Sequence, residues 1–432
     1  MRVRQIEVKR DGWDVALAAL QRPAMQADTG LEDTVRGIIR DVRLRGDVAL
    51  LELGRKFDAP DLNALVVEPE DLDRAEAAVD PALADAIRVA AANIRAFHAR
   101  QRENSWSFSS GGVTTGQLIR PLQRVGVYVP GGTALYPSTV LMTVIPAREA
   151  GVEEVVLCTP AQKDGSVSPA VLYAASIAGA RLIIRAGGAQ ALAAMAFGTE
   201  SVPRVDKVVG PGNLYVNIAK RLLYGHVDVD MLAGPSEVCV LADGSASARF
   251  VAADMLTQAE HDGDAAAFLI TPSAALASAV QAAIERALVG QPRRAILERA
   301  LLEHGALIVG ETMAQCIDLA NRCAPEHLAL MVEDPWRLLP SIRSAGAILM
   351  GRYTPQALGD YIAGPSHCLP TAGTARFSSP LSVESFLKRT SVVDCSIEAL
   401  RELAGHITAF ARGEGFEAHA QGVEVRLEEP ET

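Results

Sequence analysis

Apolar residues recur with two different periods along the middle of this chain. Short apolar runs are each followed by a longer stretch in which apolar residues return at helical spacing. Between residues 124 and 224 we find four such units. The predicted strands are 125–129, 154–158, 181–185 and 207–209, and the helices that follow them are 138–150, 168–179, one ending at 197 and one ending at 224. Strands that alternate with helices predict a parallel sheet with helices on its faces.

The same alternation returns after residue 236. Apolar runs typical of buried strands lie at 237–241, 267–270, 306–309, 328–332 and 347–350. Stretches with helical spacing lie between them, at 247–261, 275–288 and 313–322. The hydroxyl of Ser247 is a plausible N-cap for the first of these helices. We therefore expect a second α/β sheet.

The two ends of the chain differ from this α/β body. Residues 1–30 form a short, partly amphipathic arm, and helical spacing runs over 31–57 and again over 81–103. The tail is predicted to be helical over 396–415 and to finish in a short strand over 423–427. The predicted fold class is α/β, with two Rossmann-like parallel-sheet domains and helical N-terminal and C-terminal extensions.

Composition narrows the class of partner and the compartment. With 432 residues, the chain is long enough for two or three domains. A net charge of −11 argues against nucleic acid and fits a neutral or cationic small molecule. The charged start and the lack of an 18-residue apolar run favour neither secretion nor membrane insertion. Six scattered cysteines without a CxxC pair suit reduced thiols, so we expect a cytoplasmic protein.

Glu326 and His327 stand side by side just before the apolar run 328–332. An isolated pair of this kind is most simply a surface turn. Histidine titrates near neutrality, however, and burial can raise the pKa of a glutamate. Two adjacent proton carriers of different type suit a reaction that transfers two protons on one substrate.

Three of the predicted strands end in glycine turns, at 130–132, 187–188 and 210–212. Ligands of parallel α/β sheets collect at the carboxyl ends of strands, where helix N-termini offer free N–H groups. A dinucleotide pyrophosphate would fit there. The GxGxxG fingerprint is absent, so simple tight turns remain the alternative.

A few side chains suit a metal ion by type. Gln258 and His261 are three residues apart on one helix face, so both can reach one ion. Asp360 is predicted to lie in a loop after the strand at 347–350, and His419 lies near the C-terminus. Mixed nitrogen and oxygen ligands suit zinc, or manganese as a substitute. Spacing alone does not join these four residues, and taken singly each is most simply structural.

Eight segments, in order, resemble the histidinol dehydrogenase family over essentially the whole chain. They are 125–132, 187–190, 208–213, 233–237, 258–261, 324–328, 359–365 and 414–419. The resemblance implies a zinc enzyme of histidine biosynthesis that oxidises L-histidinol to L-histidine through the aldehyde and reduces two NAD⁺.

Site residues carry over at the matching positions. The resemblance implies that the zinc ligands are Gln258, His261, Asp360 and His419, and that the acid–base pair is Glu326 and His327. It also implies NAD contacts by Tyr128, Gln190 and Asn213. The implied substrate contacts are Ser236, Glu414, His327 and the four zinc ligands.

The resemblance further implies an intertwined homodimer with shared active sites, in which His419 completes the zinc site of the partner chain. The domains expected on this basis are an arm, a discontinuous domain on the metal and substrate side, a domain on the NAD side, and a tail that crosses the dimer. Their boundaries are 1–30 for the arm, 31–123 with 237–381 for the first α/β domain, 124–236 for the second and 382–432 for the tail. Neither nucleic acid nor a membrane is an expected partner.

One departure from the family pattern concerns the substrate. Ser366 precedes His367 where the family commonly has Asn, so substrate orientation near the metal loop could differ slightly. A related zinc- and NAD-dependent dehydrogenase for another amino or sulfonated alcohol is the main alternative. A non-catalytic metal-binding or scaffold protein on the same fold is disfavoured, because both Glu326 and His327 are present.

Overall fold

The computed structural model describes residues 1–22, 29–131 and 135–428. Gly132 of the first glycine turn and residues 23–28 of the predicted arm lie outside the described residues. The chain forms two compact units. Unit 1 comprises residues 1–101 and 123–386, and unit 2 comprises residues 102–122 and 387–432.

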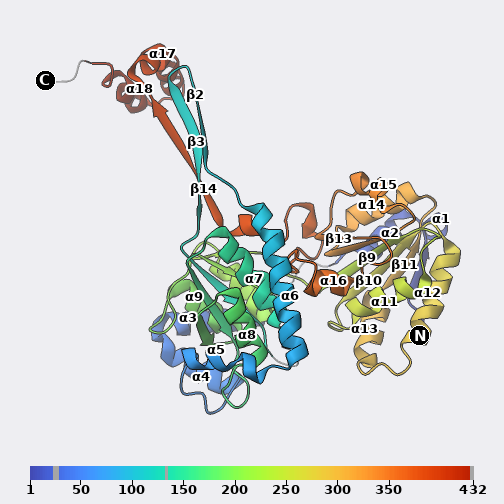
Figure 1. Ribbon diagram of the computed structural model, residues 1–432. Coiled ribbons are helices and arrows are strands. Elements are labelled where there is room, and N and C mark those ends of the chain that lie inside the picture. The colour runs from blue at the N-terminus through green and yellow to red at the C-terminus, as the bar shows by residue number, and fades with distance from the viewer. Residues whose placement is uncertain (23–28, 132–134, 429–432) are drawn as a thin grey trace. The chain divides into compact units, whose positions relative to one another are not determined.

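A five-stranded parallel sheet forms one half of unit 1, in the order β6-β5-β4-β7-β8 (Figure 1). Its strands are β4 (Arg124–Tyr128), β5 (Glu154–Thr159), β6 (Leu182–Arg185), β7 (Lys207–Val209) and β8 (Asp228–Val229). The helices between them are α7 (Pro137–Ala150), α8 (Pro169–Ala178), α9 (Gly188–Phe197) and α10 (Leu214–Leu223). The four predicted β-α units are therefore confirmed, with ends that shift by at most one residue.

A second parallel sheet has six strands, in the order β1-β11-β10-β9-β12-β13. Its strands are β1 (Arg4–Glu7), β9 (Glu237–Ala242), β10 (Ala266–Thr271), β11 (Ala306–Val309), β12 (His327–Met331) and β13 (Ala347–Met350). Apolar clusters cover both faces: Val240 and Leu269 lie in one, and Leu241 and Phe268 in the other. Burial on both faces explains why these strands appear as continuous apolar runs.

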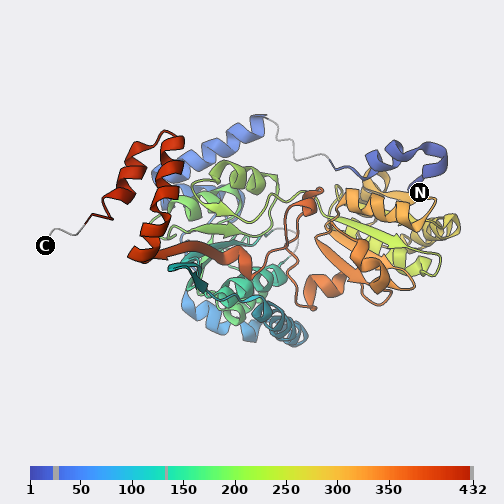
Figure 2. The same ribbon diagram turned by 90° about the horizontal axis from the view of Figure 1, so that it is seen from above.

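Helices surround this second sheet. They are α1 (Val8–Asp11), α2 (Trp13–Leu20), α11 (Ala248–Ala259), α12 (Ala274–Ala287), α13 (Arg294–His304), α14 (Met313–Cys323), α15 (Pro335–Leu338) and α16 (Gln356–Tyr361). The short 3-10 helix η3 (Leu339–Ser341) follows α15. Two further 3-10 helices come later in the chain: η4 (Thr374–Arg376), and η5 (Val383–Phe386), which packs against α7 of the five-stranded sheet. Figure 2 shows α1 and α2 beside the six-stranded sheet. The predicted arm thus contributes an edge strand, because β1 pairs with β11.

The helical segment after the arm packs on the five-stranded sheet. Its elements are α3 (Thr29–Arg45), α4 (Asp47–Phe57), α5 (Pro69–Arg74), η1 (Glu76–Ala78), α6 (Pro81–His98) and η2 (Ala99–Gln101). Val35 of α3 and Leu50 of α4 share one core with Ile184 and Leu192. The sequence prediction had grouped this segment with residues 237–381. Helical periodicity shows that a helix has an apolar face, but it does not identify the sheet that covers that face.

Unit 2 contains a three-stranded antiparallel sheet and a helical hairpin. Its elements are β2 (Trp106–Ser110), β3 (Val113–Pro121), β14 (Leu387–Cys395), α17 (Ile397–Gly413) and α18 (Glu417–Glu424). The helix predicted over 396–415 is confirmed as α17. The strand predicted over 423–427 is wrong, because the N–H groups of Val425 and Leu427 donate to Gln421 and Glu424. Local helical bonds therefore satisfy backbone groups that a strand would have paired with a neighbour.

No helix among residues 1–22, 29–131 and 135–428 is both long enough and apolar enough to cross a bilayer.

Candidate active site

Glu326 and His327 lie inside unit 1, where β12 begins. Helix α14 ends at Cys323, and the next residue, Ala324, has a φ of 45° that turns the chain toward the strand. Strand β12 lies between β9 and β13 in the six-stranded sheet. Glu326 is 7% exposed and His327 is 5% exposed. The surface-turn interpretation of this pair is therefore wrong.

One backbone position holds both members of the pair. The N–H of Glu237, at the start of β9, donates to Glu326 Oε2 over 2.9 Å. The Glu237 carbonyl oxygen lies 3.4 Å from His327 Nδ1. That ring nitrogen is also 3.8 Å from Glu326 Oε2. Because β9 and β12 are paired parallel strands, their register keeps these groups together.

Asp360 completes a buried array with His327. Its Oδ1 lies 3.1 Å from His327 Nε2. Burial lowers the pKa of His327, but the charges of Glu326 and Asp360 outweigh it and raise that pKa to about 9. Burial favours a protonated Asp360, yet its contact with His327 holds its pKa below the ordinary value. Asp360 lies in α16, so the prediction that it is a loop residue is wrong.

Two buried carboxyl groups stand next to each other in this array. Burial raises the pKa of Glu326 to about 7, although the His327 charge opposes the shift. Glu237 is completely buried, and burial together with the Glu326 charge raises its pKa to about 7 as well. Sequence reasoning did not give Glu237 a role. A glutamate that opens a strand of otherwise apolar residues was the available signal.

Gln258 and His261 lie at the end of α11 and just beyond it. The N–H of His261 donates to the Gln258 carbonyl over 3.2 Å, so both belong to the last helical turn. Burial lowers the pKa of His261. The charge of Asp360 acts to raise this pKa, and the charge of His327 acts to lower it. The structure thus brings Gln258, His261, Asp360 and His327 into one neighbourhood of unit 1.

The Gln258 side chain supports the chemistry of a metal ligand. Its amide is completely buried and accepts a hydrogen bond from Gln356 Nε2 over 2.7 Å. Gln258 Nε2 and Gln356 Oε1 have no hydrogen-bond partner among the described residues. Reversing both amides keeps the bond between them and leaves Gln258 Oε1 free to bind a cation. Gln356 therefore orients Gln258, a role that sequence reasoning missed.

The implied zinc ligands are mixed in type and come from both units. Within the described residues, no group of three His, Cys, Asp or Glu side chains is arranged to hold a metal ion. Unit 1 contributes an amide, an imidazole and a carboxylate. These donors suit zinc or manganese once a further ligand is supplied.

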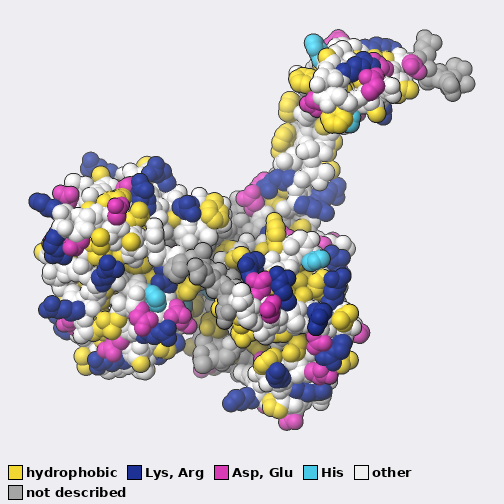
Figure 3. All heavy atoms as spheres, turned by 180° about the vertical axis from the view of Figure 1, so that it is seen from behind, with side chains coloured by type: hydrophobic (Ala, Val, Ile, Leu, Met, Phe, Trp, Pro, Cys, Tyr) yellow, Lys and Arg dark blue, Asp and Glu magenta, His cyan; other side chains and the backbone are white. Residues whose placement is uncertain are grey.

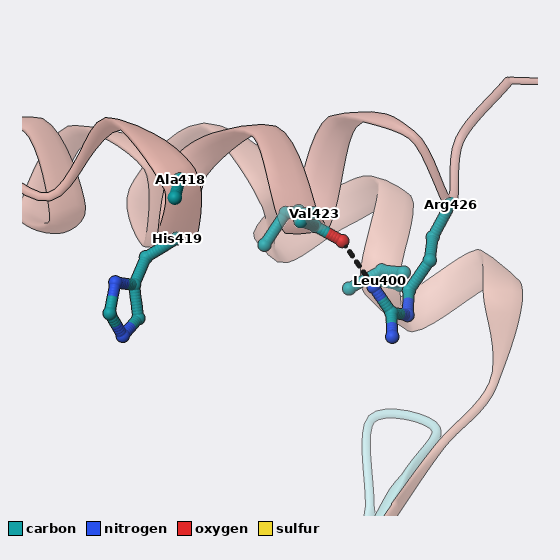
Figure 4. Close-up of a pocket in the computed structure, with 6 residues that line it drawn as sticks. Leu400, Ala418, His419, Val423 and Arg426 are labelled. Atoms are coloured by element: carbon teal, nitrogen blue, oxygen red, sulfur yellow. Dashed lines mark hydrogen bonds between the residues drawn. The ribbon is translucent and has the colours of Figure 1, made fainter.

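The last two predicted contacts belong to unit 2. His419 lies on α18, exposed, with its ring centroid 5.1 Å from that of Phe416. It lines a hollow of about 460 Å³ with Leu400, Val423 and Arg426 (Figure 4). Glu414 directly follows α17 and is also exposed. The structure places neither residue relative to unit 1.

The three predicted NAD contacts follow β4, β6 and β7 of the five-stranded sheet. Tyr128 ends β4, and its hydroxyl accepts the N–H of Gly188 over 3.0 Å. Gln190 lies in the first turn of α9, next to that bond. Asn213 caps α10, because its Oδ1 accepts the N–H of Val216. The turn at Gly210 passes so close to Tyr128 that a Cβ there would lie 2.1 Å from the tyrosine carbonyl oxygen.

Ser236 and Ser366 occupy different surroundings. Ser236 directly precedes β9 and is half-buried. Ser366 is buried: its hydroxyl donates to the Met142 carbonyl over 3.1 Å and accepts the N–H of Cys368 over 3.2 Å. The Ser366 side chain is thus used in backbone contacts. The neighbouring His367 places Nδ1 2.9 Å from the Asp360 carbonyl oxygen.

Comparison with known proteins shows the family of this chain. The family model for histidinol dehydrogenase matches residues 20–427. The histidinol dehydrogenase of Moorella thermoacetica is 51% identical over 425 residues, which cover 98% of each chain. That of Halalkalibacterium halodurans is 49% identical over 406 residues, which cover 93% of this chain and 96% of the other.

A solved structure gives the same result for the fold. The crystal structure of histidinol dehydrogenase from Elizabethkingia anophelis superposes with a TM-score of 0.94 at 38% identity and covers 98% of both chains. The family model spans almost the whole chain, and the relatives match it at about half of all positions. This chain therefore belongs to the histidinol dehydrogenase family.

Proposed function

We propose that this enzyme oxidises L-histidinol to L-histidine through L-histidinal and reduces two NAD⁺, as the final step of histidine biosynthesis. The observation that carries the proposal is the buried array of Glu326, His327 and Asp360 at the start of β12. An alcohol becomes an acid by losing two hydrides and gaining one water. The reaction therefore needs a base at each oxidation and a group that activates water between them.

His327 and Glu326 divide the proton transfers in this proposal. In its neutral form His327 removes the alcohol proton as hydride leaves for the nicotinamide, and it acts as base again when the hydrated aldehyde is oxidised. Because its pKa is raised to about 9, the neutral form becomes more populated as pH rises toward 9. Glu326 takes a proton from water during hydration. A pKa of about 7 for Glu326 supports this role, because such a carboxyl group exchanges protons near neutral pH. Each role supplies about 10²–10⁴-fold in rate.

Gln258, His261 and Asp360 would hold a zinc ion together with His419. When bound, the ion supplies Lewis-acid polarisation and orients the substrate, since zinc has no redox chemistry of its own. The buried Gln258 amide with its unpartnered atom supports this assignment. Ser236 and Glu414 would contact the substrate, as would His327 and the zinc ligands. Near that site Asp360 positions His327 through the 3.1 Å contact.

Tyr128, Gln190 and Asn213 would bind NAD⁺ at the carboxyl end of the five-stranded sheet. Parallel α/β sheets bind nucleotides at this edge, and two helices begin here, at Gly188 and Leu214. Each catalytic cycle would need NAD⁺ at this edge of the sheet twice, because two hydrides leave one carbon atom of the substrate. The same three residues would therefore bind both NAD⁺ molecules in turn.

A homodimer with shared active sites is a further part of the proposal. Unit 2 exposes large apolar side chains of its sheet and of α17, which include Trp106 at 53%, Phe108 at 60% and Phe410 at 76%. Figure 3 shows hydrophobic side chains on its surface. A partner chain would bury them.

All six cysteines are free and five are buried, which supports a reducing, cytoplasmic location.

The decisive experiment counts products. Purified enzyme is given L-histidinol and excess NAD⁺, and NADH is compared with histidine formed. We expect a ratio of two, and we expect a strong chelator to abolish turnover until zinc is returned. A ratio of one with accumulated aldehyde would contradict the four-electron reaction. A screen of other amino and sulfonated alcohols in the same assay tests the alternative substrate class.

A further inference from the structure

A buried lysine and a buried aspartate form hydrogen bonds with the glycine turn that precedes Asn213. Lys220 Nζ lies 2.5 Å from Asp230 Oδ1, and their side chains are 1% and 2% exposed. Lys220 donates to the Gly210 carbonyl over 2.6 Å. Asp230 Oδ2 accepts the Gly210 N–H over 2.8 Å. One ion pair therefore holds both backbone polar groups of a single residue.

Gly210 occupies a position where only glycine fits. Its φ is +117°, and a Cβ there would collide with the Tyr128 carbonyl. A residue without a side chain has no packing of its own to hold it in place. The charged pair supplies this restraint through the backbone instead.

Asp230 belongs to the linker, residues 230–237, that leads from β8 to β9. A second side chain of α10 also contacts this linker. Asn217 lies three residues before Lys220 on α10, so both side chains share a face. Its Nδ2 donates to the carbonyl oxygens of Gly212 and Asn213 over 3.1 and 3.2 Å. Its Oδ1 accepts the N–H of Ala233 over 3.1 Å. Asn217 thus joins the turn at residues 210–213 to the linker at residues 230–237.

The linker leads directly into the acid–base array. Asp230 Oδ1 also accepts the N–H of Met231, and the N–H of Gly234 donates to Thr371 Oγ1 over 2.5 Å. Ser236 and Glu237 follow, and the Glu237 backbone contacts Glu326 and His327. Residues 210–213 carry a proposed NAD contact, and residues 230–237 carry a proposed substrate contact.

We infer that Lys220, Asp230 and Asn217 are positioning residues that fix the NAD-binding turn against the substrate-binding linker. The inference rests on the proposed function. Hydride transfer is very sensitive to alignment, and a displacement of about 1 Å can cost about 100-fold in rate. An ion pair that satisfies its donors and acceptors with backbone groups on both sides suits this task.

The chain offers a control pair of the same residue types, in which the Asp228 side chain is 52% exposed, compared with 2% for Asp230. Lys207 of β7 and Asp228 of β8 form another Lys–Asp pair, with Nζ 3.0 Å from Oδ2, on neighbouring strands of the same sheet. This pair lies at the opposite end of β7 from the Gly210 turn. Replacing it should affect stability without moving the turn.

The test compares Lys220→Met/Asp230→Asn with Lys207→Met/Asp228→Asn. The double change at 220 and 230 avoids leaving one buried charge unpaired. We expect KM for NAD⁺ to rise about tenfold and kcat to fall about 10–100-fold in the first variant. KM for L-histidinol and the zinc content should stay close to wild type, and the control variant should keep wild-type kinetics.

Equal kinetic constants in the two double variants, at comparable Tm, would overturn the inference. If the first variant does not fold, Asn217→Leu gives the same test without touching a charge. A rise in KM for NAD⁺ supports the inference, and unchanged kinetics in folded protein refute it. An assay of the wild-type enzyme distinguishes failure of this inference from failure of the proposed function. If the wild-type enzyme forms no NADH from L-histidinol, the proposed function itself is refuted.

Discussion

The chemistry of single residues in this protein depends on burial more than on residue type. Glu326 and His327 are adjacent in sequence, yet their surroundings differ. Glu326 faces a backbone N–H and a second buried carboxyl group, whereas His327 lies between Glu326 and Asp360. Burial raises the pKa of the carboxyl group, and the two carboxylates raise that of the imidazole. These different surroundings suit different roles in one reaction.

Replacing Glu326 by Gln tests this division of labour. The change removes the group proposed to activate water and keeps its size. Oxidation of histidinal should fall by about 10²–10⁴-fold, the range of one acid–base role, because this step needs the hydrate. Reduction of histidinal by NADH should fall far less, since it uses no water. Both rates are measured by absorbance of NADH, with Glu333→Gln, an exposed glutamate beyond β12, as control. Equal losses in both directions would contradict the division.

Asp254 gives a pH-dependent prediction at the same scale. Its side chain is buried in α11, Oδ2 has no hydrogen-bond partner among the described residues, and burial raises its pKa to about 6. In the unfolded chain an aspartate titrates near pH 4. The stability contributed by the protonated folded form is thus complete below pH 4. It declines as pH rises to 6 and stays constant above, for a loss of up to about 3 kcal/mol.

Asp254→Asn removes this titration. We expect the Tm of the variant, relative to wild type, to increase between pH 4.5 and pH 6.5 and then to level off. Thermal unfolding of both proteins in chelator-containing buffers measures the difference. At the acid end both side chains are neutral, so that measurement is the internal reference. A difference that does not vary with pH would show that Asp254 is charged in the folded protein.

At the scale of elements, periodicity predicted the two parallel sheets well. The strand at 347–350 and the helix at 313–322 were located to within one residue, because buried strands form continuous apolar runs and amphipathic helices show one apolar face. The sheet of unit 2 escaped prediction. All five residues of β2 are exposed, and β3 shows no alternation of buried and exposed positions. Trp106 to Ser109 alternates apolar and polar residues, but this run has the minimum length for a strand signal, and β3 does not extend it.

Sequence reasoning missed Glu237, because its contacts join segments that are distant in sequence. Glu237 and Glu326 are 89 residues apart, and their contact exists because β9 and β12 pair. Nothing local in the sequence indicates that pairing. The four-residue strand β1 joins the sheet from the opposite end of the chain for the same reason. Resemblance indicated the residue types of the site, whereas strand order explains how those in unit 1 are held.

At the scale of the whole molecule, unit 2 cannot bury its own surface. Val393 of β14 is 71% exposed and Phe410 of α17 is 76% exposed, whereas Ala404 and Ala411 are among the few residues of α17 that are buried. Small side chains occupy the buried positions of α17, whereas the large apolar side chains of unit 2 are exposed. A monomer would expose this surface to water, so a second chain is its expected partner.

Mixing two inactive variants tests whether His419 acts on the partner chain. His261→Asn removes a proposed ligand from unit 1, and His419→Asn removes one from unit 2. Each variant alone should lack activity and should bind little zinc, because every site loses one ligand. Chains mixed at equal amounts and refolded together should form a heterodimer in which one of the two sites is intact. Random pairing gives about half heterodimers and hence about one quarter of wild-type activity and zinc content.

The same mixture distinguishes the two possible arrangements of the ligands. If His419 completed the site of its own chain, every chain in the mixture would lack one ligand, and neither activity nor zinc binding would return. Zinc content is measured after gel filtration, so that the result does not depend on catalysis alone. His406→Asn, a change to another histidine of unit 2, serves as the control and should behave as wild type. Recovery near one quarter therefore requires both a dimer and a ligand donated between chains, since neither condition alone restores a complete site.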